Sequence, residues 1–110
     1  MTDKNQFKKL EDLWETIQER VNNSSPKDSY VSSLFSKGIK ECAKKLGEEA
    51  VETSLAALSK NKEDTVKESA DLLFHLLVLW KAAGLRLEEI MAELSRRESI
   101  SGLTEKNNRN

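Results

Sequence analysis

The sequence contains few residues that cross-link or interrupt a chain. Its 110 residues include one cysteine, one proline and four glycines. The single cysteine, Cys42, excludes an internal disulfide and a cysteine-based zinc site, and we expect it to be a small core residue. The scarcity of proline and glycine leaves long stretches that can form helices. The composition, 37% hydrophobic and 34% charged, is typical of a helical, soluble protein.

The chain also lacks an excess of charge and a long apolar segment. The net charge is −1, which gives no general attraction to nucleic acid or to an anionic membrane. The longest apolar run, residues 72–80, is interrupted by His75 and is far shorter than the ~18 residues that a membrane span needs. No basic-then-apolar signal segment opens the chain, so we expect a cytoplasmic protein.

Apolar residues recur with helical spacing through most of the chain, and no segment alternates as a strand. Helices are predicted over residues 3–21, 30–59, 61–83 and 87–97. Gly38 is expected to divide the second stretch into a short and a long helix. Asp28 or Ser29 is expected to cap the second stretch and Asn61 the third, which should stop at Gly84. An all-α protein of four to five helices is therefore predicted.

The organisation is expected to be one all-α domain over residues 1–97 and a polar C-terminal tail over residues 98–110. Residues 72–80 are apolar on every side of a helix, which is typical of a helix that is fully buried. Four or five helices cannot easily cover such a helix, so we expect a homodimer that completes the helical bundle. Its interface is predicted to include Leu73, Leu77 and Trp80.

Two acidic groups lie in stretches that are otherwise typical of buried helix. Glu48, Glu49 and Glu52 form the first, and Glu68 and Asp71 form the second. The pairs Glu49/Glu52 and Glu68/Asp71 are each spaced i, i+3, so each pair projects from one side of its helix. Carboxylates beside apolar side chains are costly to keep ionised unless a cation neutralises them. A divalent cation held between two antiparallel helices is therefore predicted.

Oxygen-only ligation favours Mg²⁺, with Mn²⁺ also possible, and Mg²⁺ commonly shares its ligands with substrate phosphates. Salt bridges along one helix, such as Lys45–Glu49, are the alternative. A di-iron bundle would need Glu-x-x-His pairs, which the sequence lacks. His75 is interpreted as a hydrogen-bonding residue behind the ligands rather than a ligand. Gly47, just before the first acidic group, allows either close helix packing or room for a ligand against the backbone.

Basic residues near the acidic groups are candidates for binding substrate phosphates. Lys45 is the strongest candidate, because it lies one turn from Glu49 on the same face of the predicted helix. An ordinary solvated surface charge is the alternative for each. The candidates are Lys37, Lys40, Lys44, Lys45, Arg96, Arg97, Lys106 and Arg109. The tail segment EKNNR is expected either to be disordered or to fold over the substrate.

Longer strings around the acidic groups resemble one enzyme family. They are SYVSSLFSKGIKECAKKLGEEAVETSLAAL and KESADLLFHLLVLWKAAGL, with the opening LEDLWETIQER and the ending SGLTEKNNR. Together they resemble the phosphoribosyl-ATP pyrophosphohydrolases of histidine biosynthesis. The pattern ExxE…ExxD alone is shared with the wider superfamily of all-α nucleotide pyrophosphohydrolases, the MazG-like and dimeric dUTPase-like enzymes. The strings GEEAVE and ESADLLFHLLVLW are more specific to the histidine-pathway branch.

The resemblance implies a dimeric all-α enzyme that uses Mg²⁺ to cleave phosphoribosyl-ATP into phosphoribosyl-AMP and pyrophosphate. It implies that Glu49, Glu52, Glu68 and Asp71 bind the metal. It also implies that Glu48 is a further ligand or the base for the attacking water. Many relatives are expected to carry a basic residue near position 33, where this chain has serine, so Lys37 or Lys40 would take over that phosphate contact.

Two other functions remain open from the sequence. One is a housecleaning pyrophosphohydrolase that acts on free nucleoside triphosphates. The other is a non-catalytic helical dimer that serves as an interaction scaffold, in which the acidic strips are salt-bridged faces. Release of pyrophosphate from phosphoribosyl-ATP would separate the first from the family function, and a response of the melting temperature to Mg²⁺ would argue against the second.

Overall fold

Five α-helices and no strand occur in the residues that the computed structural model describes, which are 6–98, 100 and 106. The helices are α1 (Lys8–Asn23), α2 (Tyr30–Lys37), α3 (Ile39–Leu58), α4 (Lys62–Ala82) and α5 (Leu87–Arg97). The all-α prediction is confirmed. The first helix begins later than the predicted residue 3, which lies outside the described residues, and ends two residues after the predicted position.

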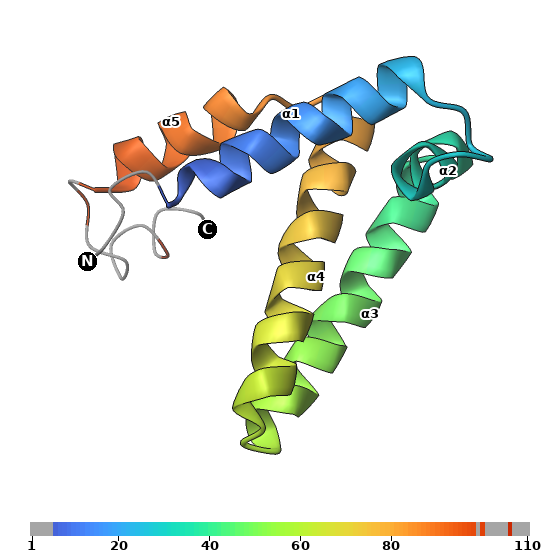
Figure 1. Cartoon of the computed structure of the whole chain (residues 1–110). Coiled ribbons are helices and arrows are strands. Elements are labelled where there is room, and N and C mark those ends of the chain that lie inside the picture. The colour runs from blue at the N-terminus through green and yellow to red at the C-terminus, as the bar shows by residue number, and fades with distance from the viewer. Residues whose placement is uncertain (1–5, 99, 101–105, 107–110) are drawn as a thin grey trace.

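The longest helices, α3 and α4, form an antiparallel hairpin that dominates the molecule (Figure 1). Residues 59–61 connect them. α1 runs across the open end of this hairpin, and α2 packs against α1, α3 and α4 at the same end (Figure 1). The acidic residues predicted to meet therefore lie on two consecutive helices that face each other.

Turn-forming side chains set the ends of these helices. Ser29 Oγ accepts a hydrogen bond from Ser32 N at 3.2 Å, so Ser29 is the N-cap of α2. Asn61 Oδ1 accepts from Asp64 N at 3.0 Å and caps α4, as predicted. Gly38 separates α2 from α3 with a φ of 93°, a conformation that only glycine adopts without strain. The predicted break is therefore confirmed.

The hydrophobic core lies where α1 and α2 meet the open end of the hairpin. Its buried residues are Ile17, Val31, Leu34, Cys42, Leu77 and Val78. Cys42 is a core residue, as predicted, and burial raises the pKa of its thiol. Leu73, one turn before Leu77, remains 43% exposed. The chain alone therefore does not cover the apolar run of α4 on every side.

An apolar groove of about 580 Å³ lies between α1, α4 and α5. Its lining includes Leu10, Trp14, Leu73, Leu77, Trp80 and Met91. The three residues predicted for a dimer interface thus all line this groove, where Leu77 also belongs to the core. None of the described helices combines the length and the hydropathy needed to cross a membrane.

Candidate functional site

Carboxylates from both acidic groups meet where α3 and α4 face each other. Glu49, Glu68 and Asp71 each place a carboxylate oxygen so that these atoms all lie within 4.8 Å of one another. We refer to these three residues as the acidic cluster. Glu49 comes from α3, and the other two come from successive turns of α4. The hairpin thus brings together three of the four residues predicted as metal ligands.

Two oxygens of the acidic cluster are buried without a partner. Glu49 Oε2 and Glu68 Oε2 receive no hydrogen bond from the described part of the chain. Burial, and then the negative charge of Glu52, raise the pKa of Glu49. A buried carboxylate oxygen without a donor is costly, and a cation placed between the helices would remove that cost. This observation favours a cation site over a set of solvated acids.

Glu52, the fourth predicted ligand, lies at the edge of the acidic cluster. It is exposed, but its carboxyl group hydrogen-bonds that of Glu68. This hydrogen bond, burial and the charges of Glu52, Glu49 and Asp71 raise the pKa of Glu68 to about 7. Carboxylates in contact cannot all ionise at low cost, so the metal-free group binds a proton well above the pH at which an isolated glutamate loses it.

Glu48 lies outside the acidic cluster and forms an ion pair with Lys45. Glu48 Oε1 is 3.4 Å from Lys45 Nζ, and the charge of Glu48 raises the pKa of Lys45. The salt-bridge alternative expected Lys45 to pair with Glu49 instead. No ion pair to Glu49, Glu68 or Asp71 occurs among the described residues. The salt-bridge alternative therefore fails for the acidic cluster.

The sequence of the helical region matches a known protein family. Residues 10–98 match the family described as phosphoribosyl-ATP pyrophosphohydrolase. The chain belongs to this family.

Relatives within the family cover nearly the whole chain. A phosphoribosyl-ATP pyrophosphatase of Erythrobacter litoralis is 52% identical over 88% of this chain and 92% of the relative. Phosphoribosyl-ATP pyrophosphatase 1 of Bradyrhizobium diazoefficiens is 49% identical over 91% of this chain and 93% of the relative. A phosphoribosyl-ATP pyrophosphatase of Paramagnetospirillum magneticum is 48% identical, covering 91% of each chain. The similarity thus extends over nearly the full length of each of these relatives.

The donor set of the acidic cluster fits the divalent cation expected for the family. Glu49, Glu68 and Asp71 offer only carboxylate oxygens, which suit Mg²⁺ or Mn²⁺ and are poor ligands for softer metals. Glu52 could join them, because it already contacts Glu68. Mg²⁺ needs few protein ligands, since it retains waters or binds substrate phosphates at its other positions.

His75 connects the acidic cluster to α2 through Tyr30, a residue that helical periodicity could not single out. His75 is buried, and its Nδ1 lies 2.8 Å from the backbone oxygen of Asp71. A carbonyl oxygen only accepts, so Nδ1 donates this bond, and Nε2 lies 3.2 Å from the Tyr30 hydroxyl. His75 therefore contacts the backbone of Asp71, one of the predicted metal ligands, and its role behind the ligands stays a prediction.

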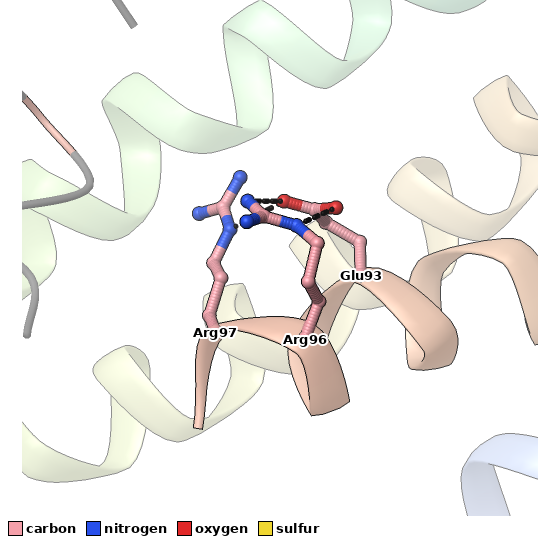
Figure 2. Close-up of polar contacts among 3 residues, drawn as sticks. All are labelled: Glu93, Arg96 and Arg97. Atoms are coloured by element: carbon pink, nitrogen blue, oxygen red, sulfur yellow. Dashed lines mark hydrogen bonds and ion pairs between the residues drawn. The ribbon is translucent and has the colours of Figure 1, made fainter. Parts of the chain in front are cut away.

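The remaining basic candidates are not gathered at the acidic cluster by any contact in the described part of the chain. Lys37, Lys40 and Lys106 are exposed. Arg97 donates from Nε to Glu93 Oε2 at 2.8 Å, and Arg96 binds the same carboxylate (Figure 2). These two arginines lower the pKa of Glu93 to about 2.

Lys45 contacts a residue predicted for catalysis, since it pairs with Glu48. Lys44 is exposed on the same helix. Arg109, with most of the tail segment EKNNR, lies outside the described residues.

Proposed function

We propose that this protein hydrolyses phosphoribosyl-ATP to phosphoribosyl-AMP and pyrophosphate, the second step of histidine biosynthesis. Membership of the family supports the substrate and the reaction. The observation that carries the proposal in the structure is that Glu49 and Glu68, whose carboxylates approach each other across the hairpin, each have a buried oxygen without a partner. Such a pair is suited to a cation that also binds the phosphates of a substrate.

Glu49, Glu68 and Asp71 would hold Mg²⁺, and Glu52 would complete the set from the edge of the acidic cluster. When bound, this ion supplies neutralisation of phosphate charge and activation of water. The chain's own contribution is positioning and electrostatics, because phosphoryl chemistry leaves little covalent work to the protein. The rigid hairpin supplies that positioning, since its two helices carry every proposed ligand.

We further propose Glu48 as the base for the attacking water. A bond from the water oxygen to phosphorus replaces the anhydride P–O bond, the pyrophosphate departs, and the water proton passes to the Glu48 carboxylate. Lys45, which holds Glu48 at 3.4 Å, would exchange this partner for a substrate phosphate. Lys37, Lys40, Arg97 and Lys106 are proposed as secondary phosphate contacts.

A homodimer is proposed as the active form. The apolar groove between α1, α4 and α5 is open in the single chain, and Leu73 and Met91 on its walls are 43% and 44% exposed. An open apolar groove of this kind is typical of a protein–protein contact. Twofold pairing is the commonest way to cover it.

The decisive experiment measures pyrophosphate release from phosphoribosyl-ATP and from a panel of nucleoside triphosphates, with and without Mg²⁺. We expect Mg²⁺-dependent release from phosphoribosyl-ATP far above the panel. Glu49→Gln and Asp71→Asn should lower kcat/KM at least about 100-fold, whereas Asp64→Asn, an exposed matched control on α4, should not.

Preference for free triphosphates would indicate the housecleaning function. No release from any of these substrates, together with no Mg²⁺-dependent rise in melting temperature, would indicate the scaffold.

A further inference from the structure

The hydroxyl of Thr53 lies between the two helices that carry the acidic cluster. Thr53 is half-buried on α3, and its Oγ1 lies 2.8 Å from the backbone oxygen of Glu49. The same atom lies 3.0 Å from the backbone oxygen of Glu68 on α4. One side chain therefore contacts the main chain of a proposed ligand on each helix. These are also the two residues whose carboxylates have buried, unpartnered oxygens.

We infer that Thr53 is a positioning residue that fixes the α3–α4 register for metal binding. The inference rests on the metal site of the proposed function and adds a residue that does not itself bind the metal.

The first argument is geometric. Hydrogen bonds from a hydroxyl to an oxygen span only about 2.5–3.0 Å between the heavy atoms. A shift of α4 by one residue moves its backbone by about 1.5 Å and turns its side chains by about 100°. Either change would break the bond to Glu68 and move the Glu68 and Asp71 carboxylates away from Glu49. The register that makes this bond is thus the register that assembles the acidic cluster.

The second argument is electrostatic. Glu49, Glu52, Glu68 and Asp71 are close enough to influence one another's charge, so their repulsion tends to separate the helices at this level. The Thr53 bond involves no ionisable group, so it joins the helices without adding a charge to this crowded level. It is a side-chain hydrogen bond that links α3 to α4 in the described part of the chain.

The test compares Thr53→Val, which keeps the shape but removes the hydroxyl, with Thr53→Ser, which keeps the hydroxyl. Thr65→Val is the matched control. Thr65 Oγ1 also bonds the backbone oxygen of the residue four positions earlier, Asn61, at 2.7 Å, but this bond stays within α4 and its N-cap and does not reach α3. Mg²⁺ affinity is measured by calorimetry without substrate, and the half-saturating Mg²⁺ concentration is measured in pyrophosphate release. Circular dichroism checks that each variant is folded.

We expect Thr53→Val to weaken Mg²⁺ binding about tenfold, as is usual when a group that orients a metal ligand is removed. Thr53→Ser should remain close to the unchanged protein in Mg²⁺ affinity, and so should Thr65→Val.

Wild-type Mg²⁺ affinity in Thr53→Val would overturn the inference, even if that variant melted at a lower temperature. Equal loss in Thr53→Ser and Thr53→Val would also overturn it, since the hydroxyl would then be irrelevant. If Thr53→Val fails to fold, Thr53→Ala, which also lacks the hydroxyl, takes its place in both comparisons. An unchanged protein that binds no Mg²⁺ would refute the metal site itself, which is a separate outcome.

Discussion

Glu68 carries much of the free-energy cost of bringing the carboxylates of the acidic cluster together. Its carboxyl group contacts that of Glu52, lies close to Glu49 and Asp71, and has one oxygen buried without a donor. A pKa of about 7 means that the folded, metal-free protein holds a proton that the unfolded chain would release near pH 4.5. Its surroundings therefore do not favour its charged form in the free protein, which is compatible with the proposed cation site.

Replacement of Glu68 by glutamine tests separately its effect on the stability of the metal-free protein and its proposed role in Mg²⁺ binding. Glu68→Gln removes a negative charge from a crowded group, so we expect the metal-free melting temperature to rise or stay unchanged. The same variant should lose the Mg²⁺-induced rise in melting temperature and the activity, because a carboxylate ligand is gone. Scanning calorimetry with and without Mg²⁺ measures both effects. Glu63→Gln, at an exposed ion pair with Lys67 on the same helix, is the control and should keep the Mg²⁺ response.

The raised pKa of Glu68 also predicts how stability depends on pH. Its pKa is higher in the folded than in the unfolded state, so unfolding releases a proton between pH 4.5 and about 7. Through this group, the metal-free protein should lose stability as the pH rises across that range. Mg²⁺ competes with the same proton.

The Mg²⁺-induced rise in melting temperature should therefore be larger at pH 8 than at pH 5.5. Thermal melts at the two pH values, with and without Mg²⁺, check the sign. A response to Mg²⁺ that is stronger at pH 5.5 would contradict the assignment.

At the scale of helices, the sequence predicted most of what the structure contains. Helix number, the break at Gly38 and the cap at Asn61 follow from apolar spacing and local turn chemistry, which depend on neighbours in sequence. The i, i+3 spacing anticipated the meeting of three of the four acids, and Glu52 lies at the edge of their cluster. The contact between Tyr30 and His75 joins residues 45 positions apart, so no local pattern could reveal it. The pairing of Lys45 with Glu48 depends on side-chain rotamers, which spacing does not fix.

Replacing two nearby glycines by alanine is expected to change the free energy of unfolding in opposite directions. Gly38 has a φ of 93° and a ψ of 173°, where a side chain is strained, so Gly38→Ala should lower the free energy of unfolding by about 1–3 kcal/mol. Gly47 lies inside α3, and a Cβ there would meet no atom within 4 Å. The packing interpretation of Gly47 is therefore wrong within this chain, and Gly47→Ala should raise the free energy of unfolding by about 0.5–1 kcal/mol.

Urea denaturation of the two glycine variants measures these changes. A raised KM in Gly47→Ala, despite greater stability, would support the other interpretation of Gly47, that the substrate approaches the backbone there. Destabilisation by Gly47→Ala, or a neutral effect of Gly38→Ala, would contradict the backbone argument.

At the scale of the whole molecule, we expect the open apolar groove to determine whether two copies of the chain form a dimer. Leu73 is 43% exposed on its wall, and a charge there could not be covered by a partner without a large desolvation cost. We expect the unchanged protein to be a dimer at micromolar concentration and Leu73→Asp to be a monomer with a lower melting temperature. Leu58→Asp is the control, because Leu58 is 78% exposed and does not line the groove. Light scattering after size exclusion distinguishes these states, and a monomeric unchanged protein would refute the dimer.

The hairpin of α3 and α4 has a consequence for how the protein reaches its native state. Every proposed ligand lies within residues 49–71, on two helices joined by a short connection (Figure 1). Contacts between such neighbours have low contact order and incur little loop-closure entropy, so they form early and rapidly. The centre of the enzyme can thus take shape on a nascent polypeptide before the segment that becomes α5 has been synthesised.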